Sequence, residues 1–387
     1  MLDIELFAGG GGMAVGLKAA GFFPAALYER DERSCETLRH NLTAAEPTLI
    51  GTINEEHIEK FEWTSTNEEV RLLAAGTPCQ PFSLGGSHKA HNDSRNLFPE
   101  LLRVVRMTRP RAVLIENVRG LIRASFRPYF EYVLRQLECP SIIPRFGERW
   151  FDHDTRIREY QVSLGYEPEY RVDFHSLDAA DFGVPQRRFR VFIVAIRREF
   201  GAFDFPKPTH SRHALTASKQ IGEYWELHEV PKRQREPTEA VLPMNGTSPM
   251  LPWVTVRHAL RGLPKPSKAE TGAWMNHWVI NGARMYNGHS GSSLDVPSKT
   301  IKAGVHGVPG GENTLIDASG SFRYYTLREA ARLQTFPDAH FFTGARIHVT
   351  RQIGNAVPCV LATTLGRALL PLIISTSKNN HQNDNKQ

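Results

Sequence analysis

The stretch Asp3–Gly12, DIELFAGGGG, joins a short apolar run to a row of glycines, and the helix-like segment Ala14–Ala20 follows it. A strand, a glycine turn and a helix in this order predict the start of an α/β fold. Glycines let the backbone turn tightly and approach a ligand, and the N-terminus of the following helix favours negative charge. The third glycine of the dinucleotide-binding fingerprint is not where that pattern needs it, so the ligand of this turn stays open.

Four further apolar runs, separated by helix-like segments, continue this pattern. We expect strands at residues 25–28, 71–75, 112–115 and 191–195, and helices after Asp31, from about Pro99 and around Phe130. Alternating strands and helices favour one mostly parallel sheet with helices on both faces.

After about residue 198 the pattern changes. As far as about residue 321 the chain is rich in Pro, Gly, Ser and His and loses its periodicity, which predicts a second, irregular domain. Four of the six tryptophans fall in it, and we expect them to be core residues rather than base-stacking groups: Trp225, Trp253, Trp274 and Trp278. Regularity returns where Thr326 and Glu329 form a capping box, and a last helix is expected over residues 357–370.

Charge and cysteine usage narrow the class of protein. The net charge of +6 and the isoelectric point of about 9.1 are compatible with an anionic partner such as nucleic acid. The four cysteines lie far apart without CxxC spacing, which disfavours a metal site or a disulfide framework and favours a reducing cytosol. The N-terminus lacks the pattern of a signal peptide, and the apolar run Ala368–Ile374 is too short to span a bilayer.

One cysteine has a functional setting. Cys79 lies in AAGTPCQPFSLGG (residues 74–86), in a loop at the carboxyl end of a predicted strand, where open α/β sheets place their ligands. A nucleophilic thiol must be exposed and able to form a thiolate. Cys35 and Cys359 lie on predicted helix faces, which favours core packing, and Cys139 sits at a helix end before a proline.

Three other polar groups stand at the ends of predicted strands. Glu116 follows the strand 112–115 and could stay protonated and donate a proton, although a capping or salt-bridged side chain is commoner for an isolated glutamate. Arg188 and Arg190 alternate on an entering strand and could hold phosphates or a carbonyl oxygen, although a basic solvent-facing edge gives the same pattern. Glu29 ends the second strand, where a carboxylate can bind a ribose diol.

Taken together and in order, these motifs resemble the DNA (cytosine-5) methyltransferases of bacterial restriction–modification systems. The blocks that carry the resemblance are ELFAGGGGMAVGLKAAGF, ERDE, GTPCQPFS, SRNLF, ENVRGL, GVPQRRFRVFIVA, YYTLREAARLQTFPD and RQIGNAVPCVLA. Each block is weak alone, but the series covers nearly the whole chain and is highly specific.

The resemblance implies a Rossmann-like, S-adenosylmethionine-dependent methyltransferase sheet with helices on both faces and a smaller, irregular target recognition domain. We place the catalytic and cofactor-binding domain at residues 1–198, completed by residues 340–375. The target recognition domain then covers residues 199–339, and a disordered tail covers residues 376–387.

The resemblance also assigns catalytic roles. Cys79 is implied to be the nucleophile that adds to C6 of a cytosine flipped out of the duplex. Glu116 is implied to bind the base edge, Asn117 to position the cysteine loop, and Arg190 to contact the cytosine O2, with Arg188 supporting it or a phosphate. The polar segment LGGSHKAHNDSR (84–95) resembles a mobile catalytic loop that closes over DNA.

S-adenosylmethionine is the cofactor that the resemblance implies. Phe7 would stack on its adenine, Gly9 and Gly11 would approach its methionine part, and Glu29 would bind its ribose hydroxyls. The remaining implied pocket residues are Thr52, Ile53, Pro78, Leu97, Asn355 and Val357. Thr52 stands where the family usually has an aspartate, from which we expect somewhat weaker cofactor affinity.

The implied partners are double-stranded DNA and a cognate restriction endonuclease, for a monomeric bacterial enzyme of the cytoplasm with no membrane association. A tRNA cytosine-5 methyltransferase is the main rival, and the long recognition region favours DNA. A non-catalytic DNA-binding homologue is disfavoured because Cys79, Glu116 and Arg190 are all present. A dinucleotide oxidoreductase would leave Cys79 and the arginine strand unexplained.

Overall fold

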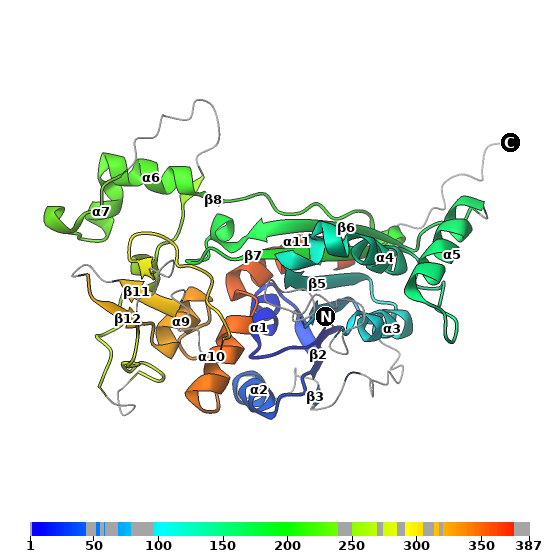
Figure 1. The fold of residues 1–387 in the computed structure, drawn as a ribbon, viewed down its shortest axis with the longest axis horizontal. Coiled ribbons are helices and arrows are strands. Elements are labelled where there is room, and N and C mark those ends of the chain that lie inside the picture. Colours follow the sequence, from blue (N-terminus) through cyan, green and yellow to red (C-terminus); the bar gives the residue numbers. More distant parts are fainter. Residues whose placement is uncertain are drawn as a thin grey trace.

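The computed structural model describes residues 2–43, 52–54, 58, 69–78, 96–163, 165–238, 250–268, 274–284, 291–304, 313–316 and 320–374. The chain forms two lobes, one built on a large sheet and one made of short elements (Figure 1). We call the second one the recognition lobe, and it covers the described residues between 210 and 356.

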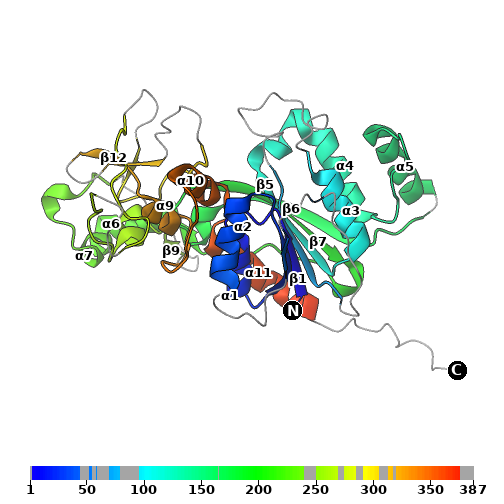
Figure 2. The same ribbon diagram turned by 90° about the horizontal axis from the view of Figure 1, so that it is seen from below.

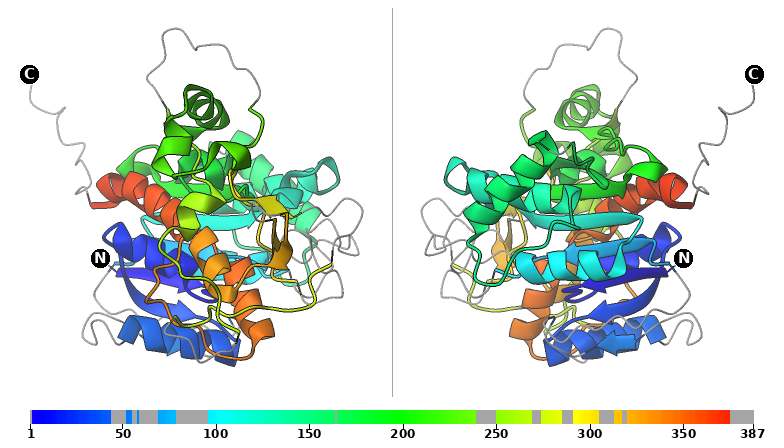
Figure 3. Two further views of the ribbon diagram at one scale, coloured as in Figure 1. Left: turned by 90° about the vertical axis from the view of Figure 1, so that its left-hand side faces the viewer. Right: turned by 90° about the vertical axis from the view of Figure 1, so that its right-hand side faces the viewer.

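Within the described residues, seven strands form the large sheet in the order β3-β2-β1-β4-β5-β7-β6. They are β1 (Leu2–Leu6), β2 (Phe23–Tyr28), β3 (Thr52–Asn54), β4 (Leu72–Gly76), β5 (Ala112–Val118), β6 (Tyr170–Asp178) and β7 (Phe189–Arg197). Strands β1 to β5 pair in parallel, whereas β7 is antiparallel to both β5 and β6. Figure 3 shows the sheet passing from the blue strands at one edge to the green strands at the other.

The mostly parallel sheet is therefore confirmed, and two of its strands, β3 and β6, were not predicted. Strand β6 was not predicted, because its sequence YRVDFHSLD is polar and its middle residues are partly or fully exposed at the sheet edge. The predicted strands 25–28, 71–75, 112–115 and 191–195 are each present, with ends shifted by up to three residues.

Helices cover both faces of the sheet (Figure 2). Helices α1 (Gly12–Ala19), α2 (Glu32–Leu38) and α11 (Cys359–Ile374) lie on one side, and α3 (Phe98–Thr108), α4 (Arg127–Glu138) and α5 (Trp150–Ser163) on the other. The backbone approach between α1 and α11 is close, because a Cβ at Gly16 would lie 2.3 Å from the carbonyl oxygen of Cys359. Glycine is therefore required at this crossing.

Local signals account for several helix ends. The Asp31 carboxylate caps α2 by accepting a hydrogen bond of 2.9 Å from the amide of Ser34, and Pro99 stands in the first turn of α3, as predicted. Cys35 and Cys359 are buried, as their predicted helix faces indicated. Helix α5 was not predicted, and its Asp154 pairs with Arg135 on α4 at 2.6 Å.

One stretch of the described residues, Arg346–Ile374, is long and apolar enough to cross a membrane. Half of its most apolar window is buried inside the fold. The leucines at 361, 365 and 369 have no exposed surface and belong to the core beneath the sheet. The apolar side chains of α11 therefore pack against the sheet and α1 inside the fold.

The recognition lobe consists of short elements. It contains α6 (Arg212–Ile221), α7 (Glu223–Leu227), α8 (Val256–Leu260), α9 (Leu327–Leu333) and α10 (Arg346–Asn355). Two small sheets pair β8 (His210–Ser211) with β9 (Leu251–Pro252), and join β10 (Ser292–Ser293), β11 (Thr314–Ile316) and β12 (Phe322–Tyr324). The predicted capping box of Thr326 and Glu329 is present at the start of α9.

Near its C-terminal end the chain passes from the hydrophobic core of the recognition lobe to that of the sheet. Residues 340–356, which we assigned to the catalytic domain, pack in a core that also contains Val256, Ile301 and Leu315 of the recognition lobe. The chain returns to the sheet core at Val357 and continues along α11. Trp225 is buried in a separate small core, and the expected tail 376–387 lies outside the described residues.

Candidate active site

The strand order reverses between β1 and β4, and the loops that follow these two strands lie side by side. Leu6 pairs with Ala75 in register, and a Cβ at Gly76 would lie 3.6 Å from the carbonyl oxygen of Phe7. Open α/β sheets bind ligands outside the carboxyl ends of the strands at such a reversal. The geometry therefore brings the glycine turn and residues 77–78, which lead into the cysteine loop, to the edge where such sheets bind ligands.

The glycine turn is held open by one carboxylate. Phe7, Gly9 and Gly11 all have positive φ (60°, 55° and 85°), which directs the loop away from the strand. Glu29 accepts hydrogen bonds from the amides of Gly9 at 2.8 Å and of Asp31 at 2.9 Å. A Cβ at Gly9 would meet nothing within 4 Å. The backbone at Gly9 thus faces open space, as a site that admits a ligand closely requires.

A buried histidine supports this turn from the recognition lobe. The Nε2 of His340 lies 3.1 Å from the carbonyl oxygen of Gly10, so that ring nitrogen carries the proton. Burial lowers the pKa of His340 to about 4, and the ring is neutral at pH 7. A Cβ at Gly10 would lie 3.0 Å from the Cβ of Gln352 on α10. Sequence reasoning missed both supporting residues, because neither stands at the end of a strand.

The other expected cofactor residues are placed as follows. The carbonyl oxygen of Val357 would be 2.4 Å from a Cβ at Gly12, so the turn that contains Asn355 and Val357 lies against the start of α1. Asn355 is exposed and Val357 is buried. Leu97 precedes α3 and packs on the sheet core, and Pro78, two residues after β4, is half-buried.

Thr52 and Ile53 belong to β3. They pair with Ala26 and Leu27 of β2, which leads to Glu29. The structure describes only their backbone, so the contact of Thr52 remains a prediction.

The loop after β4 is tied to the end of β5. Gly76 pairs with Glu116, and Cys79, three positions further on, lies outside the described residues. The side-chain amide of Asn117 donates to the hydroxyl of Thr77 at 2.8 Å, and this hydroxyl donates to the carbonyl oxygen of Glu116 at 3.3 Å. Asn117 thus fixes the backbone that leads into the cysteine loop.

Glu116 and Arg190 face each other across β5 and β7. The Nε of Arg190 lies 2.7 Å from Oε1 of Glu116, and Glu116 is 6% exposed. The strand register explains the contact: Arg190 pairs with Val118, two residues from Glu116 and on the same side of the sheet. The pair is a close ion pair rather than an aligned hydrogen bond, because Oε1 has no hydrogen-bond partner among the described residues.

Arg188 lies elsewhere. It is 1% exposed, and its Nη1 and Nη2 donate to the carbonyl oxygens of Ile301 at 3.1 Å and Gly354 at 2.9 Å. This guanidinium therefore joins the start of β7 to the recognition lobe. Such burial does not fit a phosphate contact, which was one of the two roles suggested for Arg188, and it leaves support of Arg190 as the other.

Two buried glutamines at the same junction were missed by sequence reasoning. Gln186 accepts from the amide of Ile301 at 2.8 Å, and its side-chain nitrogen lies 3.0 Å from Oε1 of Gln334. Gln334 donates in turn to the carbonyl oxygen of Ile353 at 2.7 Å. The one feature of the sequence that could have identified Gln186 and Gln334 is their position inside two of the family-like blocks, at GVPQRRFR and LQTFPD.

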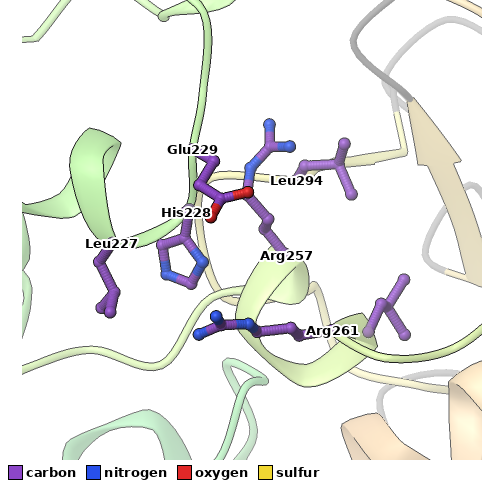
Figure 4. Close-up of a pocket in the computed structure, with 7 residues that line it drawn as sticks. Leu227, His228, Glu229, Arg257, Arg261 and Leu294 are labelled. Atoms are coloured by element: carbon purple, nitrogen blue, oxygen red, sulfur yellow. The ribbon is translucent and has the colours of Figure 1, made fainter.

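A cavity of about 320 Å³ lies in the recognition lobe, away from the sheet edge (Figure 4). It is lined by Leu227, His228, Glu229, Arg257, Leu260, Arg261 and Leu294. Burial, with the neighbouring His258 and Arg257, lowers the pKa of His228 to about 4. The guanidinium of Arg257 is hydrogen-bonded to Asp295. The guanidinium of Arg261, the other arginine that lines the cavity, has no side-chain partner among the described residues.

The comparisons with known proteins agree on one family. Residues 1–139 and 156–370 match the model of the C-5 cytosine-specific DNA methylases, and part of α5 falls in the gap between the two ranges. The Type II methyltransferase M.PspPI of Psychrobacter sp. (strain TA137) is 30% identical over 97% of this chain and 80% of its own length. M.NgoMIV of Neisseria gonorrhoeae is 28% identical over 95% of this chain and 96% of its own length.

Solved structures share the fold at low identity. A putative DNA modification methyltransferase from an Escherichia coli prophage superposes with a TM-score of 0.59 at 20% identity, covering 96% of this chain and 99% of that chain. Spodoptera frugiperda DNMT2 gives 0.58 at 16% identity, covering 95% and 99%. The two-lobed α/β architecture is thus that of known methyltransferases. From the family match and the relative at 30% identity, the chain belongs to the C-5 cytosine-specific DNA methylase family and is a DNA (cytosine-5) methyltransferase.

Proposed function

We propose that the enzyme methylates C5 of one cytosine within a short specific sequence of double-stranded DNA, with S-adenosylmethionine as methyl donor. The observation that carries this proposal is the Glu116–Arg190 pair beside the backbone that leads into the Cys79 loop. The relatives named Type II methyltransferases support a role as the modification enzyme of a bacterial restriction–modification system, paired with a cognate endonuclease. The enzyme acts as a cytoplasmic monomer on each DNA strand in turn.

The glycine edge fits S-adenosylmethionine. The open space at Gly9 admits a ligand against the backbone, and the Glu29 carboxylate stands where ribose hydroxyls are bound. Phe7, Gly11, Leu97 and the turn at Asn355 and Val357 would complete the site, with Thr52 and Ile53 from β3 and Pro78 after β4. When bound, the cofactor supplies an electrophilic methyl group.

Cys79 supplies the nucleophile. Its thiolate forms a bond to C6 of the cytosine, the C5–C6 π pair moves between C4 and C5, and the C4–N3 π pair moves onto N3, which leaves an enamine whose C5 is nucleophilic. Glu116 accepts a hydrogen bond from the exocyclic amine and gives a proton to N3, and Arg190 donates to O2, so the negative charge that the thiolate brings to the ring is neutralised as it develops. After methylation a water molecule takes the C5 proton, the electron pair of that C–H bond re-forms the C5–C6 double bond, and the bond from C6 to Cys79 breaks with its electron pair on sulfur.

The target carbon lies inside the base stack, so the base must leave the duplex, which costs a few kcal/mol. Asn117 positions the cysteine loop for this event through its bonds to Thr77. Arg188 supports Arg190 indirectly, because it anchors the chain directly before β7, the strand that carries Arg190, to the carbonyl groups of Ile301 and Gly354.

The first test is bisulfite sequencing of genomic DNA from a methylation-deficient host that expresses the chain. Protected cytosines within one short motif are expected, and Cys79→Ala should remove them. Cys139→Ala is the matched control, because Cys139 is buried at the end of α4 and should leave the methylation pattern intact. Unmodified DNA with soluble protein, or methylation that persists in Cys79→Ala, would contradict the proposal, and modified tRNA instead would establish the RNA activity.

A further inference from the structure

A ladder of cations and aromatic rings runs along the edge of the active site. The guanidinium carbon of Arg119 lies 5.4 Å from the centre of the Phe189 ring, and that of Arg187 lies 5.1 Å from the same ring. Arg187 also stacks over Trp253 of the recognition lobe at 4.8 Å. Each distance is within the range in which a guanidinium is attracted to an aromatic face.

The ladder lies where β5 ends and β7 begins, next to Glu116 and Arg190. Phe189 directly precedes Arg190 on β7, and Arg119 directly follows Val118, the residue paired with Arg190. Phe189 is 37% exposed and Arg119 is exposed. The outer end of the ladder is therefore accessible from solvent at the carboxyl edge of the sheet.

The two arginines of the ladder differ in their partners. Arg187 forms an ion pair with the buried Asp178, and its amide donates to the carbonyl oxygen of Ser298 at 2.7 Å. Trp253 is fixed as well, because its indole N–H donates to Asp181 at 2.9 Å. The Arg119 guanidinium has no hydrogen bond or ion pair within the described part of the chain.

A similar arrangement stands at the opposite end of the same two strands. There Arg111 and Arg197 flank the ring of Phe200 at 4.5 Å and 5.1 Å. Both guanidinium groups are paired with Glu69. The end next to the active site differs, because Asp178 neutralises Arg187 and Glu116 neutralises Arg190 while no carboxylate pairs with Arg119 among the described residues.

We propose that Arg119 is a phosphate-binding residue for the DNA strand that carries the target cytosine. The ring of Phe189 orients its guanidinium, and Arg187 with Trp253 holds that ring in place. A planar, permanently charged guanidinium suits a phosphate diester, and an uncommitted one loses no internal ion pair on binding. This inference rests on the proposed function, because it assumes that DNA approaches the Glu116 edge.

A phosphate contact has a signature that a structural role lacks. Such a contact exists before and during the reaction, so its loss raises KM for DNA and leaves kcat unchanged. It also reduces the slope of log affinity against log salt by about one, because one fewer counterion is released. For Arg119→Gln we expect roughly a tenfold higher KM for DNA, with an unchanged KM for S-adenosylmethionine.

The test measures DNA affinity across a salt series, together with KM and kcat, for wild type, Arg119→Gln, Arg119→Lys and Phe189→Leu. Lysine keeps the charge and should restore the salt slope. Leucine keeps bulk but removes the aromatic face, and should weaken binding less than Arg119→Gln does. The matched control is Arg197→Gln, from the ladder at the other end of β7, which should leave the salt slope and KM for DNA unchanged.

An Arg119→Gln enzyme with wild-type KM and salt slope would overturn the inference. So would a fall in kcat with an unchanged slope, which would mark Arg119 as a residue that only supports the packing of the active site. A wild-type enzyme that methylates no DNA would contradict the proposed function instead, so the two failures are distinguishable.

Discussion

The two lobes each contain a buried carboxylate beside an arginine, and the two pairs differ in how completely the carboxylate is bonded. In the recognition lobe, Asp295 accepts from Nε of Arg257 at 2.6 Å, from its Nη2 at 2.9 Å and from the hydroxyl of Tyr224 at 2.8 Å. At the sheet edge, Oε1 of Glu116 is 2.7 Å from Nε of Arg190 but has no aligned hydrogen bond among the described residues.

This difference is the one expected between a structural pair and a pair that binds substrate. A buried carboxylate with all its bonds made inside the protein stabilises the fold and has nothing left for a ligand. A buried carboxylate with an unmade bond costs free energy in the free enzyme and recovers it when a donor arrives. Asp295 fits the first description and Glu116 the second, and in the proposed mechanism the cytosine amine is the donor that Glu116 receives.

The largest effect that tests this comparison is expected from Glu116→Gln. Glutamine keeps the shape but removes the charge that attracts Arg190, and it cannot give a proton to N3 of the cytosine. We expect kcat to fall by about 10²–10³-fold, the range for loss of one preorganised group that stabilises developing charge. Steady-state methyl transfer to a DNA duplex measures it.

Glu69→Gln is the control for that variant. Glu69 pairs with Arg111 and Arg197 at the opposite end of the same sheet, so it receives the same chemical change beside the same strands. Its kcat should match that of the wild type. A Glu116→Gln enzyme within about twofold of wild type would erase the distinction between the two carboxylates.

The intermediate effect is expected from Asp295→Asn. Burial would raise the pKa of Asp295, but the bonds from Arg257 and Tyr224 outweigh it and hold the pKa below its usual value. Removing the charge leaves Arg257 without its partner in a largely buried site. We expect the free energy of unfolding to fall by about 2–4 kcal/mol, with kcat on bound DNA little changed.

Urea denaturation followed by circular dichroism measures this loss, with Asp338→Asn as control. Asp338 pairs with Arg332 in the same lobe but is exposed, so its loss should cost about 1 kcal/mol or less. If Asp295→Asn kept full stability and changed the methylated sequence instead, Arg257 would belong to base readout and the comparison would be wrong.

The sheet edge could be predicted because its geometry follows from register. Glu29, Gly76 and Glu116 each directly follow an apolar run in the sequence. Parallel strands bring the residues at their carboxyl ends to one edge of the sheet. The pairing of Arg190 with Glu116 was not predicted, because it depends on β7 running antiparallel beside β5 with Arg190 opposite Val118. The resemblance to a known family named the same residues independently.

The recognition lobe could not be predicted in this way. Its strands are two or three residues long, too short for a period to show. Its stabilising contacts join residues far apart in the sequence, as when Tyr224 donates to Asp295. The packing of residues 340–356 with Val256 and Ile301, and the reach of Arg188 to Gly354, likewise depend on how two lobes fit together.

The smallest effect is expected from a third buried carboxyl group, Asp3, which has no arginine beside it among the described residues. Asp3 on β1 is 1% exposed, and its Oδ1 has no hydrogen-bond partner among the described residues. Burial raises the pKa of Asp3 to about 7, well above the value in an unfolded chain. The folded state therefore holds a proton that the unfolded state releases, and the wild type loses stability as pH rises from about 4 to about 7.

Asp3→Asn removes this penalty, because asparagine stays neutral at every pH and keeps nearly the same volume. The variant should be more stable than wild type, and its advantage at pH 8 should exceed that at pH 5 by about 1–3 kcal/mol. Denaturant titrations at both pH values measure the difference. Asp173→Asn, on the exposed middle of β6, should show the same small change at both. A pH-independent effect of Asp3→Asn would mean that a partner already balances Asp3 in the folded state, and an unmade bond would then no longer set Glu116 apart from other buried carboxylates.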